Sequence, residues 1–405
     1  MKKSFFALAL IISLISSTLA ADAVINYSKT YQTIRGFGGI NHPEWIGDLN
    51  DAQRSKAFKN GSGDLGFTIL RVFVNEDSNA WSKALATAKY AKSQGALLFA
   101  SPWNPPSWMT EKFSGGGRSG KRLKKANYGD YANHLNNFVT FMKNNGAELY
   151  AISIQNEPDY AHEWTWWTVE ECVDFLANYA SRINCKVMSP ETFQYNKQYY
   201  NAILGNWAAN NVVKVFGTHF YGTQRSQMDF PALENDAREI WMTEVYVPNS
   251  SSDADTWPEA VEVAVNMHNG LVVGSMSAYV WWYIRRSYSP LKENGNISKR
   301  GYMMAHFSKW VRPGAKRVDA TESPSSGVYI SAYKNTDGSL VIVAVNNGNN
   351  SYSQLFTVNG KTVNSINRYK TTQYANLALT TGLAKTGNGF FAQLDAKSVS
   401  TFIVK

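Results

Sequence analysis

Residues 149–158 read Leu149-Tyr150-Ala151-Ile152-Ser153-Ile154-Gln155-Asn156-Glu157-Pro158, an apolar, β-branched run that stops at a polar triplet and a proline. Such a run is typical of a strand buried on both faces, as in a parallel sheet. Pro158 cannot continue a central strand, so we expect the strand to end beside Glu157. In parallel α/β folds and barrels, chemistry takes place at this carboxyl end of the strands. The stretch therefore predicts a core strand with a functional carboxylate at its end.

Seven other strand-like runs alternate with helix-like segments between about residues 36 and 310. They are Gly36–Gly39, Thr68–Val74, Ala96–Ala100, Lys186–Met188, Val212–Phe216, Ile240–Met242 and Ala278–Tyr283. Eight strands separated by helices predict an α/β fold of the (β/α)8 TIM barrel type. The alternative is an open doubly wound sheet. That fold would place a glycine-rich phosphate loop after a strand, and the sequence has no G-x-G-x-x-G in that context.

The pattern changes after Arg312-Pro313-Gly314. Residues 328–333 alternate with period two, 335–338 form a turn signal, and 340–345 and 399–404 are further strand-like runs. Residues 358–361 give a second tight-turn signal. We expect residues 313–405 to form a β-sandwich-like side sheet, joined by one or more strands from residues 21–35. Because no linker separates the parts, this side domain should pack tightly on a barrel of residues 36–312.

The N-terminus has the features of a secretory signal peptide. Lys2 and Lys3 precede an apolar run over residues 5–15 and small residues up to Ala20. We expect cleavage after Ala20, or after Ala21, and secretion to the extracellular space without membrane association. A membrane anchor is the alternative, but the run is shorter than the ~20 residues that a span needs.

The two cysteines, Cys172 and Cys185, are not expected to form a disulfide. Residues 169–182 have the spacing of a helix, which would separate the cysteines by ~20 Å at a rise of ~1.5 Å per residue. A disulfide needs Cα atoms within ~7 Å.

The composition limits the possible partners. The formal net charge of +9 allows an acidic polymer but does not require one. The chain has 13 Trp and 22 Tyr, and exposed aromatic rings suit stacking on sugars. The histidines are scattered and the cysteines are unpaired in sequence, so we predict neither a metal site nor a cofactor. No basic-aromatic module for nucleic acid is present. The basic residues between Arg118 and Lys125 are interpreted as a solvated loop.

A second strand-like run, residues 239–244, also ends in a carboxylate, Glu244. Cleavage of a glycosidic bond needs one carboxyl group to protonate the leaving oxygen. It also needs a second carboxylate to attack the sugar or activate water. In a barrel, Glu157 and Glu244 would lie on strand ends that face each other across the barrel mouth. The pair indicates glycoside cleavage, with strand-end ion pairs or helix caps as the alternative.

Polar residues at other strand positions can support this pair. Asn156 can bind a sugar 2-hydroxyl, and Arg71, a charge inside an apolar strand, needs a carboxylate partner. An arginine beside a nucleophile would keep the pKa of that carboxyl low, although a structural ion pair explains Arg71 equally well. His219 and Tyr221 follow another strand, where a lone histidine is as often a packing residue as a ligand.

Aromatic and basic residues follow two further strands. Trp103 follows one directly, and Trp282 lies in the last, so both can form sugar-stacking walls unless they belong to the core. Arg285 and Arg286 are adjacent and therefore point in different directions, so one can support the structure and the other can bind a ligand. Arginine with Tyr288 nearby suits a planar carboxylate, bound in bidentate fashion.

Together these residues resemble the bacterial glucuronoxylanases of glycoside hydrolase family 30, subfamily 8, which are clan A retaining glycosidases. The matching motifs are Gly36-Phe37-Gly38-Gly39, Trp103-Asn104-Pro105-Pro106, residues 152–158, Trp241-Met242-Thr243-Glu244, residues 281–288 and Ser298-Lys299-Arg300-Gly301-Tyr302. The resemblance covers the whole mature chain. It implies a (β/α)8 barrel with a tightly attached side β-domain and endo-cleavage of β-1,4-xylan with retention.

The resemblance also implies roles for individual residues. Glu157 matches the general acid/base and Glu244 the nucleophile. Arg286 matches the arginine that pairs with the carboxylate of a 4-O-methylglucuronic acid branch, aided by Trp282, Tyr288 and Tyr246. The expected partner is therefore glucuronoxylan, bound by a monomer.

One departure from the family pattern lies in the loop after Tyr246. Relatives carry a serine three residues after this tyrosine, whereas this chain has Asn249, which could still donate a hydrogen bond. Two other interpretations stay open: the same chemistry on unbranched xylan, galactan or a β-glucoside, and a non-catalytic polysaccharide-binding protein.

Overall fold

The computed structural model describes residues 18–115, 118–160, 164–248 and 253–405 of the chain. Most of the predicted signal peptide, and Asn249, lie outside these described residues. Among the described helices, none has the length and apolar character needed to cross a bilayer.

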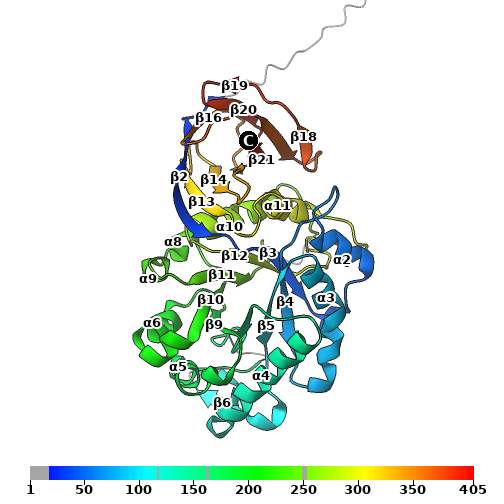
Figure 1. Ribbon diagram of the computed structural model, residues 1–405, viewed down its shortest axis with the longest axis vertical. Helices are drawn as coiled ribbons and strands as arrows, with labels where there is room; N and C mark the ends of the chain where they lie inside the picture. Colours follow the sequence, from blue (N-terminus) through cyan, green and yellow to red (C-terminus); the bar gives the residue numbers. More distant parts are fainter. Residues whose placement is uncertain (1–17, 116–117, 161–163, 249–252) are drawn as a thin grey trace, which may run out of the picture.

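Eight parallel strands close into a barrel, which lies below a separate curled sheet (Figure 1). The barrel strands are β3 (Gly36–Asn41), β4 (Ile69–Val74), β5 (Leu97–Pro102), β8 (Ala151–Ser153), β9 (Lys186–Thr192), β10 (Val213–His219), β11 (Glu239–Glu244) and β12 (Ala278–Tyr283). Each predicted barrel strand coincides with one of them. The predicted α/β barrel with a side β-domain is therefore confirmed.

Helices surround the barrel and connect its strands. They are α1 (Pro43–Ile46), α2 (Asp51–Phe58), α3 (Leu85–Ser93), α4 (Tyr128–Asn144), α5 (Val169–Asn178), α6 (Lys197–Gly205), α7 (Trp207–Val212), α8 (Arg225–Met228), α9 (Pro231–Glu234), α10 (Val261–Val272) and α11 (Lys299–Ser308). Thr168 and Glu171 form a capping box that starts α5. Beyond α5 a short 3-10 turn, η4 (Ala180–Arg182), completes the predicted helix. Cys172 and Cys185 are free.

The sequence suggested a solvated loop for the basic residues between Arg118 and Lys125, and this prediction was wrong. Most of them lie on β7 (Arg118–Leu123), which forms a hairpin with β6 (Thr110–Gly115). Cross-strand pairing explains the difference, because Arg122 lies opposite Glu111 and its Nε donates to that carboxylate at 2.7 Å.

Alternate residues of β4 point into the barrel at successive heights. Ile69 belongs to an apolar layer with Phe99, Met188, Val215 and Trp241. Arg71 is the next inward residue, and Phe73 then joins an aromatic layer with Trp103 and Tyr283. The polar groups at the height of Arg71 thus lie between an apolar floor and an aromatic rim.

The curled sheet has eleven strands, and its main path runs β18-β17-β21-β15-β14-β13-β2-β16-β20-β19. Their bounds are β1 (Thr18–Leu19), β2 (Ala23–Thr33), β13 (Lys316–Ala320), β14 (Val328–Lys334), β15 (Leu340–Asn346), β16 (Tyr352–Asn359), β17 (Ile366–Thr371), β18 (Ala378–Thr380), β19 (Lys385–Thr386), β20 (Gly389–Leu394) and β21 (Ser398–Val404). The N-terminal β2 pairs with β13 and β16. The chain bends at Gly360 and Lys361, where the sequence carries a tight-turn signal, and β16 pairs with β20 and β2 rather than with the following β17.

The side sheet docks on the barrel through one face of β15. Val341, Val343 and Val345 belong to the core of the barrel and its helices, whereas the alternating Leu340 and Ile342 belong to the core of the side domain. On α11, the His306 ring lies 2.8 Å from the hydroxyl oxygens of both Thr371 and Thr401 in the sheet. The two parts therefore share buried apolar and polar contacts.

Candidate active site

Glu157 and Glu244 both lie at the carboxyl end of the barrel. Glu244 is the last residue of β11 and pairs in register with His219, the last residue of β10. Glu157 follows β8 and has a φ of 45°, which is rare for a residue with a side chain. Such strained backbone is found at functional sites more than elsewhere. Only 3% of Glu157 and 5% of Glu244 is exposed, so both carboxylates are largely withdrawn from water.

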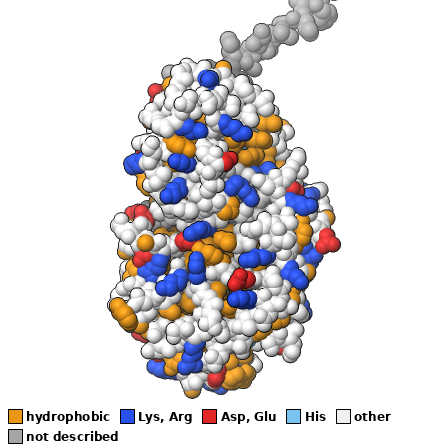
Figure 2. Space-filling model, viewed as in Figure 1, with side chains coloured by type: hydrophobic (Ala, Val, Ile, Leu, Met, Phe, Trp, Pro, Cys, Tyr) orange, Lys and Arg blue, Asp and Glu red, His pale blue; other side chains and the backbone are white. Residues whose placement is uncertain are grey.

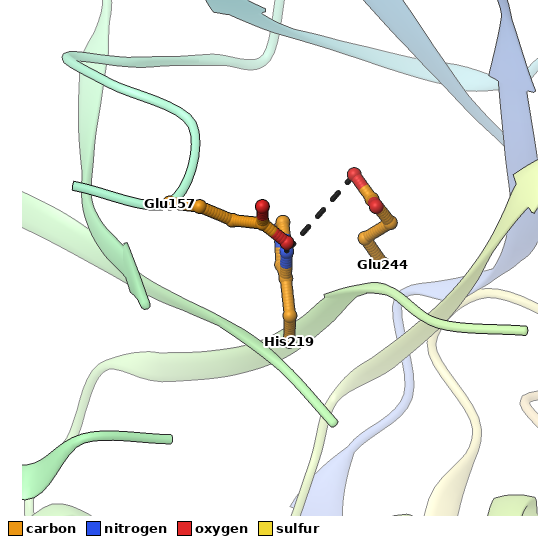
Figure 3. A group of neighbouring side chains, drawn as sticks. All are labelled: Glu157, His219 and Glu244. Carbon is orange, nitrogen blue, oxygen red and sulfur yellow. Dashed lines mark hydrogen bonds and ion pairs between the residues drawn. The ribbon is translucent and has the colours of Figure 1, made fainter. Parts of the chain in front are cut away.

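The two carboxylates and His219 converge on one point (Figure 3). His219 Nδ1 lies 2.7 Å from Glu157 Oε1 and 4.0 Å from Glu244 Oε2. One oxygen of each glutamate and one ring nitrogen all lie within 4.8 Å of one another. The histidine, for which packing and ligand roles were equally open, is thus a direct partner of Glu157.

Arg71 is the partner of the second carboxylate. Its guanidinium is fully buried, hydrogen-bonds to Glu244 Oε2 through Nη1, and donates to Asn156 Oδ1 through Nη2 at 2.7 Å. Tyr221 donates its hydroxyl to the other oxygen of Glu244 at 2.8 Å. Both oxygens of Glu244 are therefore oriented, and the four polar residues predicted to support the site meet around the two glutamates.

A third buried carboxylate, Glu191 on β9, was not among the predicted site residues. Its Oε1 accepts from Arg71 Nη2 at 3.2 Å, and its Oε2 accepts from Ser101 Oγ at 2.7 Å. The sequence carried a signal for it, because Glu191 follows a predicted strand and a proline precedes it. A carboxylate shortly after an apolar run is the same pattern that pointed to Glu157.

Burial and charge set the protonation of the pair formed by Glu157 and His219. Burial raises the pKa of Glu157 to about 7, and the nearby Glu244 charge adds to this, whereas His219 and Arg71 oppose it. Burial would lower the pKa of His219, but Glu244, Glu157 and Glu191 outweigh it and raise that pKa to about 9. A carboxyl group that stays protonated near neutral pH is equipped to donate a proton.

Aromatic side chains form the rim above the carboxylates. Trp103 is buried with its ring 4.8 Å from the Arg71 guanidinium and 5.9 Å from the Trp282 ring. Tyr246 and Tyr288 are half-buried, with ring centroids 5.0 Å apart. The predicted aromatic residues therefore lie together, with Trp282, Tyr246 and Tyr288 partly open to solvent.

The adjacent arginines point into different surroundings, as the sequence suggested. Arg285 Nη2 donates to the backbone oxygens of Ile46 and Gly47, and 15% of its side chain is exposed. Arg286 has 42% of its side chain exposed, and its Nη1 lies 3.4 Å from Glu293. Arg285 is thus tied to the C-terminal end of α1, and Arg286 is the more exposed of the two.

A metal ion is not the best explanation for the convergence of Glu157, His219 and Glu244. These residues do offer three ligand atoms. However, both oxygens of Glu244 are already held by Arg71 and Tyr221, Glu157 Oε1 is held by His219, and the positive charge of Arg71 opposes a cation.

Similar proteins connect this site to a known family. Over 389 residues the chain is 53% identical to glucuronoxylanase XynC of Bacillus subtilis, with 95% of this chain and 92% of that protein covered. The chain belongs to glycoside hydrolase family 30. Residues 314–402 also match the glycosyl hydrolase family 30 beta sandwich domain.

Solved structures support the membership over the whole fold. A GH30 endoxylanase from Clostridium papyrosolvens superposes with a TM-score of 0.89 at 41% identity, covering 95% of this chain and all of that one. A family 30 subfamily 8 xylanase from Clostridium acetobutylicum gives a TM-score of 0.86 at 34% identity, covering 95% and 99%. The subfamily resemblance seen in the sequence motifs is therefore confirmed, and this family 30 chain is a glycoside hydrolase.

Proposed function

We propose that this family 30 enzyme is an endo-acting, retaining β-1,4-xylanase that cleaves 4-O-methylglucuronic-acid-branched xylan. The observation that carries the proposal is the approach of Glu157 and Glu244 to within 4.8 Å, oxygen to oxygen. A retaining site needs carboxyl groups ~5–5.5 Å apart, whereas an inverting site needs ~6.5–9.5 Å for an intervening water. The names of the relatives above describe enzymes that act on xylan, and the similarity over most of the chain supports the same substrate for this protein.

The geometry supports one role for each carboxylate. Glu244, oriented by Arg71 and Tyr221, attacks the anomeric carbon and forms a glycosyl-enzyme ester, while the bond to the leaving oxygen breaks. Glu157 gives its proton to that oxygen. Glu157 then takes a proton from water, whose oxygen attacks the anomeric carbon and releases Glu244. Asn156, held by Arg71, is placed to bind the 2-hydroxyl of the sugar.

The substrate branch is assigned to Arg286. This arginine is accessible beside Tyr283, with its guanidinium 5.7 Å from that ring, and its charge acts on Tyr288. A guanidinium fork can bind a glucuronate carboxylate in bidentate fashion. The face in Figure 2 shows more Lys and Arg side chains than acidic ones, and the formal charge of +9 is compatible with an anionic polymer. Trp282 and Tyr246 complete the proposed binding surface, and the buried Trp103 packs against Trp282. A contribution of Asn249 stays a prediction, because it lies outside the described residues.

The remaining features of the protein follow from the sequence. We propose that residues 1–20 direct secretion and are removed, so that the enzyme acts outside the cell as a monomer. The mature chain would then comprise residues 21–35 and 313–405 in the side domain and 36–312 in the barrel.

Mass spectrometry of the products from glucuronoxylan tests the substrate. We expect each product to carry a single 4-O-methylglucuronic acid branch at a fixed position from the reducing end, because Arg286 aligns the chain. The Glu244→Gln variant, which lacks the nucleophile, should release no product. Products with branches at random positions, together with equal rates on linear xylan, would contradict branch recognition but would still support a xylanase. Binding of xylan without release of reducing sugar would contradict an enzymatic function.

A further inference from the structure

We propose that Glu191 is a positioning residue that fixes Arg71 and His219, and through them the nucleophile and the acid/base. The inference rests on the proposed function, since it assigns a task to a residue behind the two catalytic carboxylates. Glu191 has no exposed surface, so its side chain cannot touch a polysaccharide in the cleft.

A single oxygen of Glu191 lies between the two cationic groups of the site. Oε1 is 3.2 Å from Arg71 Nη2 and 3.6 Å from His219 Nε2. Arg71 reaches Glu244 with its other terminal nitrogen, and His219 reaches Glu157 with its other ring nitrogen. Both catalytic carboxylates are therefore connected to Glu191 through one intervening side chain each.

The second oxygen and the backbone fix Glu191 itself. Oε2 accepts from Ser101 Oγ, which also accepts from Arg71 Nε at 3.1 Å, so the carboxylate and the guanidinium share a partner on β5. The Glu191 carbonyl accepts from the Glu157 backbone N–H at 3.1 Å. Both residues have positive φ, 54° and 45°, so two strained positions are linked by a hydrogen bond. The backbone turn that presents Glu157 thus depends on the segment that carries Glu191.

Charge gives Glu191 a task beyond geometry. A buried guanidinium and a buried imidazolium require nearby negative charge. Burial would raise the pKa of Glu191, but Arg71 and His219 outweigh it and lower that pKa to about 2. With Glu157 protonated, the anionic Glu191 and Glu244 then balance the cationic Arg71 and His219. The charged groups around Glu191 are Arg71 from β4, His219 from β10, Glu244 from β11 and Glu157 from the turn after β8. Ser101 faces it from β5.

The test compares the wild-type enzyme with Glu191→Gln, which keeps the shape of the side chain and removes its charge. We expect kcat on glucuronoxylan to fall on the order of 100-fold, since small misplacement of reacting groups has that effect. KM should change less than about threefold, because Glu191 contacts no substrate. Loss of a negative charge makes protons leave the Glu157 and His219 pair more easily. The basic limb of the kcat/KM profile should therefore move to lower pH, by about one unit.

A measurement without substrate accompanies the kinetics. In protein labelled at histidine, NMR titration should show His219 losing its proton at lower pH in Glu191→Gln than in the wild type, with the signal assigned by its absence in His219→Asn. If the wild-type enzyme cleaved no xylan, the proposed function would fail while this titration still tested Glu191. An unchanged His219 titration and pH profile would overturn the inference even if kcat fell, because the loss would then be structural.

Glu191→Asp provides the matched control and the alternative should the glutamine variant fail to fold. Aspartate keeps the charge but shortens the side chain. We expect the His219 titration and the pH limbs to lie closer to their wild-type positions than in Glu191→Gln, because the charge is kept, and kcat to fall about tenfold. Wild-type kcat in Glu191→Asp would contradict a positioning role, since the oxygen would no longer reach both cationic groups.

Discussion

His219 Nδ1 lies 2.7 Å from Glu157 Oε1, so the proposed acid/base is held by a cationic group inside the barrel. This contact lowers the pKa of Glu157, whereas burial and the Glu244 charge raise it, and the result is a pKa of about 7. The balance keeps Glu157 protonated below neutral pH and allows it to act as a base in the second half of the reaction.

We expect kcat/KM on glucuronoxylan to fall as pH rises above about 7, because Glu157 then loses the proton that it must donate. In His219→Asn the charge that stabilises the Glu157 carboxylate is gone, so the pKa of Glu157 rises. The basic limb should move to higher pH by about one unit. The pH–rate profiles of the two proteins provide the measurement.

His134→Asn is the matched control for this experiment, because its ring lies on α4 against Trp81 and Tyr131, away from Glu157. It should leave the basic limb in place. A limb that stayed at its wild-type position in His219→Asn would contradict the role of the histidine charge. The opposite shifts expected for His219→Asn and Glu191→Gln follow from the opposite charges that the two variants remove.

Substitutions of Arg286 and Arg285 should have different effects, the first on selectivity for branched xylan and the second on protein stability. Removal of Arg286 should lower kcat/KM on glucuronoxylan about 10- to 100-fold, the effect of one or two charge-assisted hydrogen bonds, and leave the rate on linear xylan unchanged. Arg285→Ala should instead lower the melting temperature and keep the ratio of the two rates, because Arg285 binds the backbone at Ile46 and Gly47. Parallel assays on the two xylans and a thermal melt decide. Equal losses on both xylans in Arg286→Ala would count against branch recognition.

The sequence predicted best where local pattern and burial coincide. Each barrel strand was visible because a strand buried on both faces needs a continuous apolar run, and Glu157 and Glu244 stand where two such runs end. Glu191 was harder to identify, because its partners Arg71, Ser101 and His219 come from three other strands and meet only when the barrel closes.

One wrong prediction and one incomplete prediction both depend on strand pairing. The basic residues between Arg118 and Lys125 have the charge of a loop, yet the opposing β6 makes them a strand. The turn signal at residues 358–361 agrees with the bend at Gly360 and Lys361, but it did not indicate that β16 pairs with β2 and β20, because no local pattern specifies such partners. Local sequence indicated that the chain turns there, and tertiary pairing decided which strands meet.

The contact between α11 and the side sheet predicts an acid-sensitive interface. The Thr401 hydroxyl donates to the His306 carbonyl at 2.9 Å, so its oxygen must accept from His306 Nδ1–H. The Thr371 oxygen accepts the Leu377 N–H, so its hydroxyl donates to His306 Nε2. Protonation of Nε2 would break this second bond. Burial accordingly lowers the pKa of His306 to about 3.

Protonation of His306 should therefore lower the folding stability as the pH decreases. In the unfolded chain His306 takes up a proton near its ordinary pKa of 6.5, whereas the folded state excludes that proton down to about pH 3. The contribution of His306 to folding stability is constant above pH 6.5. Below pH 6.5 it decreases by about 1.4 kcal/mol per pH unit, which amounts to about 2 kcal/mol at pH 5. Urea denaturation at pH 7 and pH 5 would compare the wild type with His306→Gln. The variant should be less stable at pH 7 but should lose about 2 kcal/mol less on acidification, since the carboxylates and the other histidines affect both proteins alike. A constant difference between the two proteins at both pH values would show that His306 carries no proton linkage.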